Sequence, residues 1–493
     1  MPNRPNVLLV TTDHWPASLL GIAGHPAIQT PTLDELSRAG VRFTNAYSEC
    51  PVCIPARRTL MTGTTPRTHG DRVFKVTEPM PAVPTLAQTF RDAGYQAYAV
   101  GKLHVHPQRN RIGFDDVILS EEGRSTLGAT DDYEIWLGEN GTVGQQFGHG
   151  MSNNLYTHRA WHLSEDAHVT NWATREMCRT IRRRDPTRPG FWYLSYAHPH
   201  PPLAPLQYYL DLYREIDPPA PITGRWAADT DALPYALQAI RHSRGGNTPE
   251  MVASIRRAFY ALCTQIDHQL RLVIGTLREE NVLNDTIICF TSDHGDMLGT
   301  HDLWAKRLFY EDSANVPMIL LGTEGDPRVP AGTVDDRLVG WQDVMPTLLD
   351  LAGIPIPDSV DGRPMHGPNH REALYGECGE GDTASRMVRE SRYKLIYYPT
   401  GNVVQLFDTV NDPNETQNLS GGPEYLEAER RLRQRLIDEM YGSDLAFVEN
   451  GELTGRPAKD HVPRGDRGLA GQRGIHWPPP PPDTSGQPVG APG

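Results

Sequence analysis

Short apolar runs recur along the first two thirds of the chain. Residues 6–12 (NVLLVTT), 191–197 (FWYLSYA) and 286–292 (TIICFTS) are almost continuously apolar and have the length of β-strands. Such runs are typical of strands covered on both faces in a parallel sheet. Residues 96–100 and 316–321 show the same pattern, so we expect five buried parallel strands.

Amphipathic stretches typical of helices lie between these runs, for example at residues 85–93 and 249–280. Strands that alternate with helices predict a doubly wound α/β fold. The expected fold class is α/β, with a large mixed, mostly parallel sheet sandwiched by helices.

The pattern changes near residue 345. Residues 343–351 predict a helix, residues 392–399 and 403–409 an antiparallel hairpin, and residues 424–440 another helix. We therefore predict three parts in chain order: an α/β domain (1–345), an α+β subdomain (346–449) and a Pro/Gly-rich tail that is disordered or draped over the surface (450–493).

Charge and composition exclude several classes of protein. The formal net charge of −14 disfavours a nucleic-acid partner, because the phosphate backbone would be repelled. No apolar stretch is long enough to span a membrane, and no secretory leader pattern opens the sequence. Six cysteines scattered over 493 residues form no disulfide framework, so we expect a protein of the reducing cytoplasm.

Polar residues follow four of the predicted strands. Since the carboxyl ends of parallel strands meet at one edge of a sheet, these residues should lie together. A polar turn would explain one such pair, but four pairs rich in carboxylates and imidazoles favour a site. The pairs are Asp13 and His14, Lys102 and His104, His198 and His200, and Asp293 and His294.

Residues 50–63 (CPVCIPARRTLMTG) contain two competing motifs. Cys50 and Cys53 form a CxxC, which is typical of a redox pair or half of a zinc site. No second CxxC follows to complete a zinc site. The other motif is Cys53-x-Pro-x-Arg57, which is rare by chance in this composition.

The second motif resembles the signature of the formylglycine-dependent sulfatases, in which the cysteine is converted to formylglycine after translation. Further blocks up to about residue 419 resemble the same family, and the resemblance implies an alkaline-phosphatase-like fold and sulfuric ester hydrolysis. The blocks are PNVLLVTTDHW at the start, GKLH (101–104), HPHPP (198–202), SDHGDMLGTHDLWAKRLFYEDSANVP (292–317), DVMPTLLDLAGIPIPDSVDG (343–362) and RYKLIYYP with QLFDTVNDPNETQNL (392–419).

The resemblance also implies a mechanism and a set of residue roles. One hydroxyl of the formylglycine hydrate made from Cys53 by a maturation enzyme would attack sulfur, and the second would release sulfate. The implied roles are as follows: one divalent metal ion held by Asp13, His14, Asp293, His294 and the modified Cys53; the hydrate stabilised by Arg57; substrate oxygens clamped by Lys102 and Lys306; a base at His104; and His200 either protonating the leaving alcohol or binding an ester oxygen.

Two departures from the common pattern refine these expectations. His14 stands where the family commonly has Asp or Gln, and nitrogen donors favour Mn²⁺ over Ca²⁺ or Mg²⁺. Asp293-His294 resembles the branch of choline-sulfatases and phosphonate monoester hydrolases. We expect a small anionic sulfate monoester as substrate; a phosphonate monoester or phosphodiester is the first alternative, and an anion-binding protein with unmodified Cys53 is the second.

Several choices stay open at the level of sequence. His198 is an alternative to His200, and Lys306 could be an ordinary solvated lysine. Aromatic residues in segments 121–165 and 205–247 predict either a lid over an organic alcohol or ordinary packing. A homo-oligomer is possible.

Overall fold

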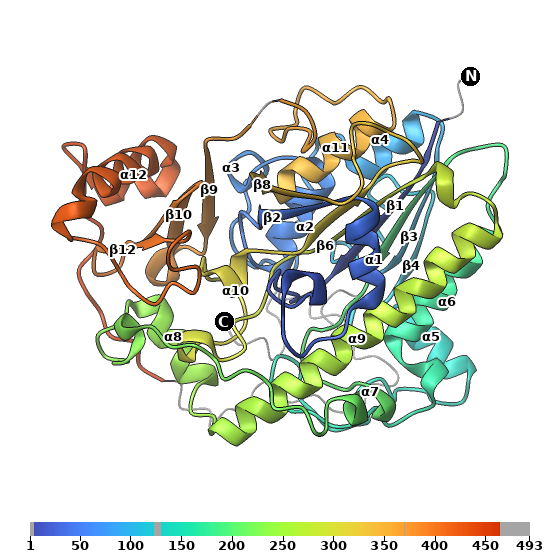
Figure 1. The fold of residues 1–493 in the computed structure, drawn as a ribbon, viewed down its shortest axis with the longest axis horizontal. Helices are drawn as coiled ribbons and strands as arrows, with labels where there is room; N and C mark the ends of the chain where they lie inside the picture. The colour runs from blue at the N-terminus through green and yellow to red at the C-terminus, as the bar shows by residue number, and fades with distance from the viewer. Residues whose placement is uncertain (1–3, 123–129, 369, 464–493) are drawn as a thin grey trace.

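The computed structural model describes residues 4–122, 130–368 and 370–463 (Figure 1). Its centre is an eight-stranded sheet in which only β7 runs antiparallel to its neighbours. This confirms the predicted fold class. In spatial order the strands are β4 (Asp116–Leu119), β3 (Gln96–Gly101), β5 (Gly190–Ser195), β1 (Asn6–Thr12), β6 (Thr286–Ser292), β7 (Met318–Leu321), β2 (Val41–Tyr47) and β8 (Thr333–Gly340).

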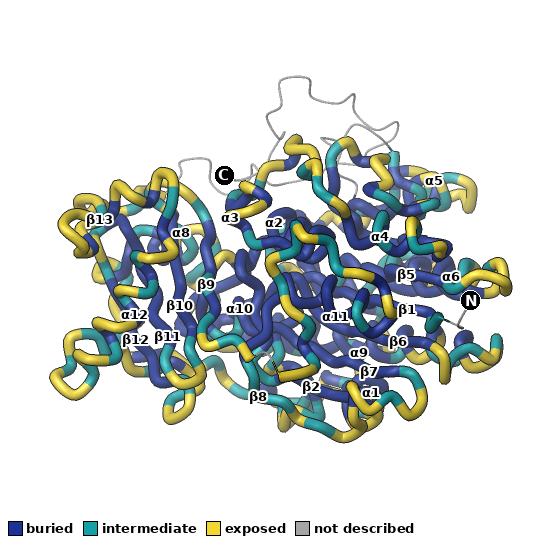
Figure 2. Tube along the Cα trace, turned by 90° about the horizontal axis from the view of Figure 1, so that it is seen from above, coloured by how far each residue is buried: buried dark blue, intermediate teal, exposed yellow. Residues whose placement is uncertain are grey.

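Helices cover both faces of this sheet, which explains why its central strands are apolar throughout (Figure 2). Leu8 and Val10 of β1 pack into a core with α1, α6 and α9, whereas Val7 and Leu9 pack into a second core with α2, α4 and α11. The helices of residues 31–351 are α1 (Pro31–Ala39), α2 (Cys53–Thr62), α3 (Pro66–His69), α4 (Leu86–Asp92), α5 (Asp132–Glu139), α6 (Val169–Arg182), α7 (Gln207–Leu212), α8 (Tyr235–Arg244), α9 (Pro249–Glu279), α10 (Glu311–Ala314) and α11 (Val344–Leu351).

One predicted strand direction is wrong. Residues 316–321 were expected to form a parallel strand, but β7 runs antiparallel to β6. The chain leaves β6, passes through a loop and the short helix α10, and returns directly to the edge of β6. A parallel pairing would need a longer crossover, usually a helix packed on the sheet.

Three strands of the large sheet were not predicted. β2 and β8 are half-buried along much of their length and carry polar residues, and β4 has only four residues. The sequence pattern used for prediction detects strands buried on both faces, so it misses the edge strands β4 and β8 and the half-buried strand β2.

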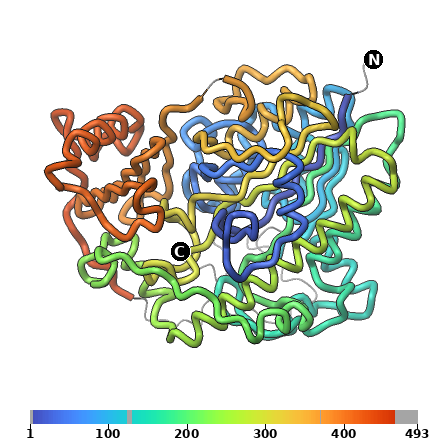
Figure 3. Tube along the Cα trace, viewed as in Figure 1, coloured from blue at the N-terminus to red at the C-terminus, as the bar shows by residue number. Residues whose placement is uncertain are grey.

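A second, antiparallel sheet lies at one end of the molecule (Figure 3). The predicted hairpin and the following helix are present as β11, β12 and α12, whereas β9 and β10 were not predicted. The elements are β12 (Val403–Asp408), β11 (Tyr393–Tyr398), β10 (Ser385–Glu390) and β9 (Ala373–Cys378) in spatial order, then α12 (Leu426–Glu439) and the short pair β13 (Val448–Glu449) and β14 (Glu452–Leu453).

The first residues of the predicted tail lie on the surface of this end. Arg456 forms a bridge with Thr400, and His461 lies 2.9 Å from His242 of α8, measured between Nδ1 atoms. Residues 464–493 lie outside the described residues, so the prediction for them stays untested. Over the described residues, no helix combines the length and apolarity needed to cross a bilayer.

Candidate active site

Backbone hydrogen bonds bring the predicted site residues to one edge of the large sheet. The N–H of Asp13 donates to the carbonyl of His198, at 3.4 Å, and the N–H of Lys102 donates to that of Ser195, at 2.9 Å. The N–H of Asp293 donates to the carbonyl of Thr12 at 3.2 Å. The carboxyl ends of β1, β3, β5 and β6 therefore meet, as expected for a parallel sheet.

Asp13, Cys53, Asp293 and His294 form a fully buried cluster at this edge. One ligand atom from each lies within 4.8 Å of all the others. The Cys53 sulfur is 3.5 Å from Nε2 of His294 and 3.8 Å from Oδ1 of Asp13. Oδ1 of Asp293 has no hydrogen-bond partner, although burial makes an unpartnered carboxylate oxygen costly. This donor set and its orphaned oxygen fit a divalent cation.

Three imidazoles at the site are oriented in the same way. Nδ1 of His14 is 2.6 Å from Oδ2 of Asp296, Nδ1 of His294 is 3.0 Å from its neighbour's carbonyl, and Nδ1 of His200 is 2.6 Å from the Pro201 carbonyl. A proton on each Nδ1 leaves the lone pair on Nε2, the form that binds a metal or accepts a proton.

His14 belongs to a second group of possible ligands rather than to the first. Its Nε2 lies with Asp13 and His200 in a set whose ligand atoms are also within 4.8 Å of one another. Nε2 of His14 and Nε2 of His200 lack hydrogen-bond partners, and burial lowers the pKa of both imidazoles well below the ordinary range. Burial therefore favours the neutral form of both rings.

Three cations surround the cluster. Nζ of Lys306 lies 2.7 Å from the Cys53 sulfur. Nε of Arg57 donates to Oδ2 of Asp293 at 3.1 Å, and Lys102 donates to a carboxylate oxygen of Asp13. Positively and negatively charged side chains thus lie next to each other at the site. The positive ones would neutralise the charge of an anionic ester.

These charges shift the acidity of the groups between them. Burial opposes ionisation of Asp13, yet Lys102 and Lys306 hold its pKa well below the ordinary value. Burial and the Asp13 charge also oppose thiolate formation at Cys53, yet Lys306 and its neighbours lower the pKa of that thiol. Burial and Asp13 raise the pKa of Asp293.

Glu121 holds the backbone of His104. The N–H of His104 and that of Leu103 donate to Oε1 of Glu121 at 2.8 and 2.7 Å, and the His104 ring packs edge-on against Phe74. His104 and His14 both have positive φ angles, 61° and 75°, which are uncommon for non-glycine residues. Backbone strain of this kind is concentrated at functional sites.

Sequence reasoning missed the residues that orient the site. Glu122 lies 3.0 Å from Nζ of Lys102 and 3.4 Å from Nδ1 of His200. Asp296 orients His14, and Ser195 accepts a 2.7 Å hydrogen bond from Arg57. Asp296 could have been found, because it lies two residues after a predicted ligand; Glu122 follows the unpredicted strand β4.

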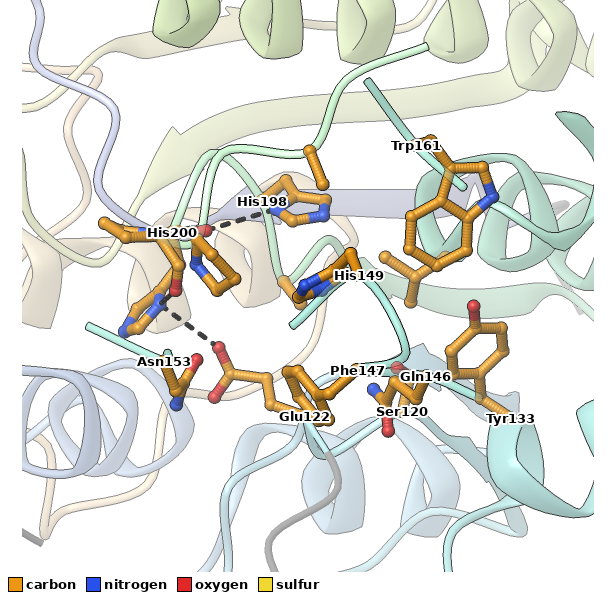
Figure 4. Close-up of a pocket in the computed structure, with 15 residues that line it drawn as sticks. Ser120, Glu122, Tyr133, Gln146, Phe147, His149, Asn153, Trp161, His198 and His200 are labelled. Atoms are coloured by element: carbon orange, nitrogen blue, oxygen red, sulfur yellow. Dashed lines mark hydrogen bonds and ion pairs between the residues drawn. The ribbon is translucent and has the colours of Figure 1, made fainter. Parts of the chain in front are cut away.

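A cavity of about 40 Å³ adjoins the cluster on the side of His200 (Figure 4). His200 and Glu122 lie at one side of this space, and Tyr133 and Trp161 lie at the other. His198 also lines the cavity, and its ring packs against His168 at 5.3 Å between centroids. The structure therefore places both candidate histidines at the cavity, but only His200 joins a group of possible metal ligands.

The aromatic residues expected to form a lid divide into two sets. Tyr133 and Trp161 of the first segment line the cavity, while Tyr156 of that segment instead donates to Asp296. In the second segment Tyr213 is buried against Thr264, and Trp226 stacks on Tyr310 at 5.0 Å. For these two residues the structure shows the second of the two predicted alternatives, ordinary packing.

Comparisons with known proteins agree with this geometry. The family model described as Sulfatase matches residues 5–354, and that described as N-sulphoglucosamine sulphohydrolase, C-terminal, matches residues 299–441. An arylsulfatase of Clostridium perfringens is 33% identical over 468 residues, covering 91% of this chain and 97% of that protein. A choline-sulfatase of Rhizobium meliloti is 31% identical over 444 residues, covering 85% and 83%.

Among solved structures, the phosphonate monoester hydrolase of Agrobacterium radiobacter is similar over 92% of this chain and all of that chain, with a TM-score of 0.76 and 25% identity. Fold, site and family matches together define an enzyme of the sulfuric ester hydrolase class. The chain belongs to the sulfatase family, within the alkaline phosphatase superfamily.

Proposed function

We propose that this enzyme hydrolyses small sulfate monoesters with a nucleophile made from Cys53. The observation that carries the proposal is the position of Cys53. Cys53 is the first residue of helix α2 and is fully buried. Its sulfur lies among Asp13, His294 and Lys306. A group at this position would meet an anionic ester among cations rather than in bulk water.

The proposal adds one bound metal ion and one covalent modification to the chain. Asp13, Asp293, His294 and residue 53 would hold one divalent ion, which supplies charge neutralisation and a more acidic nucleophile. Formylglycine at residue 53, produced by a maturation enzyme, supplies as its hydrate one hydroxyl for attack and another for release of sulfate. We propose Mn²⁺ ahead of Ca²⁺ or Mg²⁺, because His294 adds a nitrogen donor to the set.

The cations of the site bind and orient the ester. Lys306 and Lys102 face the position of the nucleophile and would hold sulfate oxygens. Arg57 is fixed by Asp293, by Ser195 and by the carbonyl of Lys102, so its guanidinium cannot follow a departing group. Fixed charges of this kind stabilise a transition state without reorganisation.

His200 is the proposed proton donor to the leaving alcohol. It lies between the cluster and the cavity, and Glu122 is placed to stabilise its protonated form. The leaving alcohol would occupy the cavity beside Tyr133 and Trp161. His104 is the proposed base for the release step.

A second candidate function is hydrolysis of phosphonate monoesters or phosphodiesters with the same machinery. The observation that favours it is the full-length similarity to a phosphonate monoester hydrolase. Both ester classes present anionic oxygens to the same cations, so the site geometry by itself is compatible with either.

Comparison of substrates on one metal-loaded, matured preparation separates these candidates. We expect the largest kcat/KM for 4-nitrophenyl sulfate, relative to a 4-nitrophenyl phosphonate monoester and a bis-(4-nitrophenyl) phosphodiester. A larger kcat/KM for either phosphorus ester would replace the first proposal with the second. The Cys53→Ala variant, prepared in the same way, controls for contaminating hydrolases.

The proposed setting is cytoplasmic, without a nucleic-acid or membrane partner. The proposal includes assembly into a homo-oligomer. Cell fractionation and sedimentation of the purified protein test the two points separately.

A further inference from the structure

The two cysteines of the CxxC motif face different parts of the molecule. The Cys53 sulfur contacts Lys306 and the ligand cluster. The Cys50 thiol instead donates to the carbonyl of Arg72 at 3.7 Å. The sequence motif therefore does not form a dithiol pair, and Cys50 is not used by the proposed mechanism.

A different cysteine, distant in sequence, lies beside Cys50. The Arg72 carbonyl that accepts from Cys50 also accepts from the N–H of Gly379, at 2.8 Å. One residue earlier in each segment, the N–H of Glu377 donates to the carbonyl of Glu49, at 2.8 Å. These contacts place Cys50 beside Cys378, and both side chains belong to the same buried cluster.

We infer that Cys50 and Cys378 are a redox-sensitive pair that closes into a disulfide under peroxide and reopens under thiol reductant. Both residues belong to one apolar core cluster and are free thiols in the structure. The bond would join the loop that precedes the nucleophile helix α2 to the end of β9 in the small sheet. Such a crosslink stabilises the fold by restricting the unfolded chain.

The chemistry of closure balances with hydrogen peroxide as oxidant. The Cys378 thiolate attacks one peroxide oxygen, which breaks the O–O bond, forms a sulfenic acid and releases hydroxide. The Cys50 sulfur then attacks the Cys378 sulfur, and the sulfenic oxygen leaves as water with the thiol proton of Cys50. Two thiols and one peroxide give one disulfide and two waters, since the proton first lost from Cys378 neutralises the hydroxide.

The environment assigns the first step to Cys378. The neighbouring Cys50 side chain lowers the pKa of the Cys378 thiol, and Arg307 assists against the effect of burial. Burial raises the pKa of the Cys50 thiol well above its ordinary value. These directions favour Cys378 as the first thiol to react and Cys50 as the resolving thiol.

Peptide mapping of the full-length protein tests this pair. The protein is treated with a small excess of hydrogen peroxide, and free thiols are alkylated in denaturant before cleavage after Lys and Arg. We expect residues 43–57 linked to residues 372–386, with the link lost after reduction. The melting temperature should rise by a few degrees with peroxide and fall back with reductant.

Variants identify the sulfurs involved. The link should persist in Cys53→Ala and vanish in Cys50→Ser and Cys378→Ser, while Cys178→Ser, a buried cysteine of α6, should behave like the wild type. Alkylation of both Cys50 and Cys378 after peroxide treatment, or a link confined to residues 43–57, would overturn the inference. The mapping of wild-type protein decides even if a serine variant fails to fold, and it does not depend on modification of Cys53.

Discussion

At the scale of single residues, the site is a set of opposite charges fixed around one sulfur. Nζ of Lys306 lies 2.7 Å from the Cys53 sulfur, and Lys102 and Arg57 hold the two carboxylates of the cluster. Each cation therefore contacts a residue of the cluster in the resting site and would also bind an anionic ester. This dual use predicts which residues should affect catalysis more than folding.

Replacement of Lys306 by alanine should reduce kcat by about 100- to 1,000-fold, the usual cost of removing one preorganised charge from a site. Steady-state kinetics on an aryl sulfate, with matured and metal-loaded protein, measure this effect. Lys75→Ala removes an exposed lysine and should leave kcat unchanged. A Lys306→Ala enzyme with wild-type kcat and KM would remove Lys306 from the catalytic site.

Replacement of Glu122 by glutamine should move the alkaline limb of the kcat–pH profile to lower pH. Burial lowers the pKa of His200, and the charge of Glu122 partly counteracts this by raising it. Without that charge the pKa falls further, so the protonated form that donates to the alcohol is lost at a lower pH. Glu165→Gln, a substitution at an exposed position, should keep the wild-type kcat–pH profile. An unchanged alkaline limb in Glu122→Gln would contradict the assignment of His200 as acid.

The sequence allowed prediction of residues that the structure brings together, but not of the residues that orient them. Asp13, Asp293 and Cys53 follow or precede elements with clear patterns, so their convergence follows from the topology of a parallel sheet. Glu122 and Tyr193 contribute through side-chain contacts between segments, namely with Lys102 and Arg57. No local pattern encodes such contacts, so they become visible only in three dimensions.

At the scale of elements, the ends of the strands decide where the chemistry lies. β3 ends at Gly101 with a φ of 101°, and the next residue is Lys102. A Cβ on Gly101 would lie 1.9 Å from the Ser195 carbonyl oxygen of β5. Glycine at this position therefore permits both the turn and the close approach of β3 to β5.

Gly101→Ala should lower the free energy of unfolding by more than Gly94→Ala does. Both positions have positive φ, which costs an L-residue about 1–2 kcal/mol, but only Gly101 adds a backbone clash worth about 1–3 kcal/mol more. No heavy atom lies within 4 Å of a Cβ placed on Gly94. Urea denaturation of both variants makes the comparison, and equal losses would contradict the close-approach argument.

The strands that could be predicted are those that pack on both faces. β1 and β6 agree with their predicted bounds, because an unbroken apolar run leaves few alternatives. The direction of β7 could not be predicted, since strand direction depends on the connection and not on the strand's own residues. β2 and β8 alternate in burial and were overlooked for that reason.

At the scale of the whole molecule, the eight-stranded mixed sheet is joined to the four-stranded antiparallel sheet. Buried Lys394 of β11 contacts Glu311 of α10 at 2.7 Å and Glu415 at 2.5 Å, so ion pairs connect the small sheet to the body. α11 packs in a core of the large sheet. The division of the chain at residues 345 and 449 stays a prediction, which limited proteolysis would test.

A divalent ion should stabilise the whole fold, because it would bind the native cluster and not the unfolded chain. Mn²⁺ at about 100 times its dissociation constant should add about 2.7 kcal/mol to the free energy of unfolding, seen as a higher melting temperature. Asp293→Asn should lose most of this response, whereas Asp358→Asn, at an exposed position, should retain it. Stoichiometric calcium in native protein would contradict the preference for Mn²⁺.

The most direct test of the account is peptide mass spectrometry across residue 53 on protein that releases sulfate from an ester. The sample should come from the natural host, because another host can lack the maturation enzyme. The account predicts that residue 53 carries the aldehyde of formylglycine or its hydrate. Residue 53 found only as a cysteine thiol in active material would contradict the proposed nucleophile and the mechanism built on it.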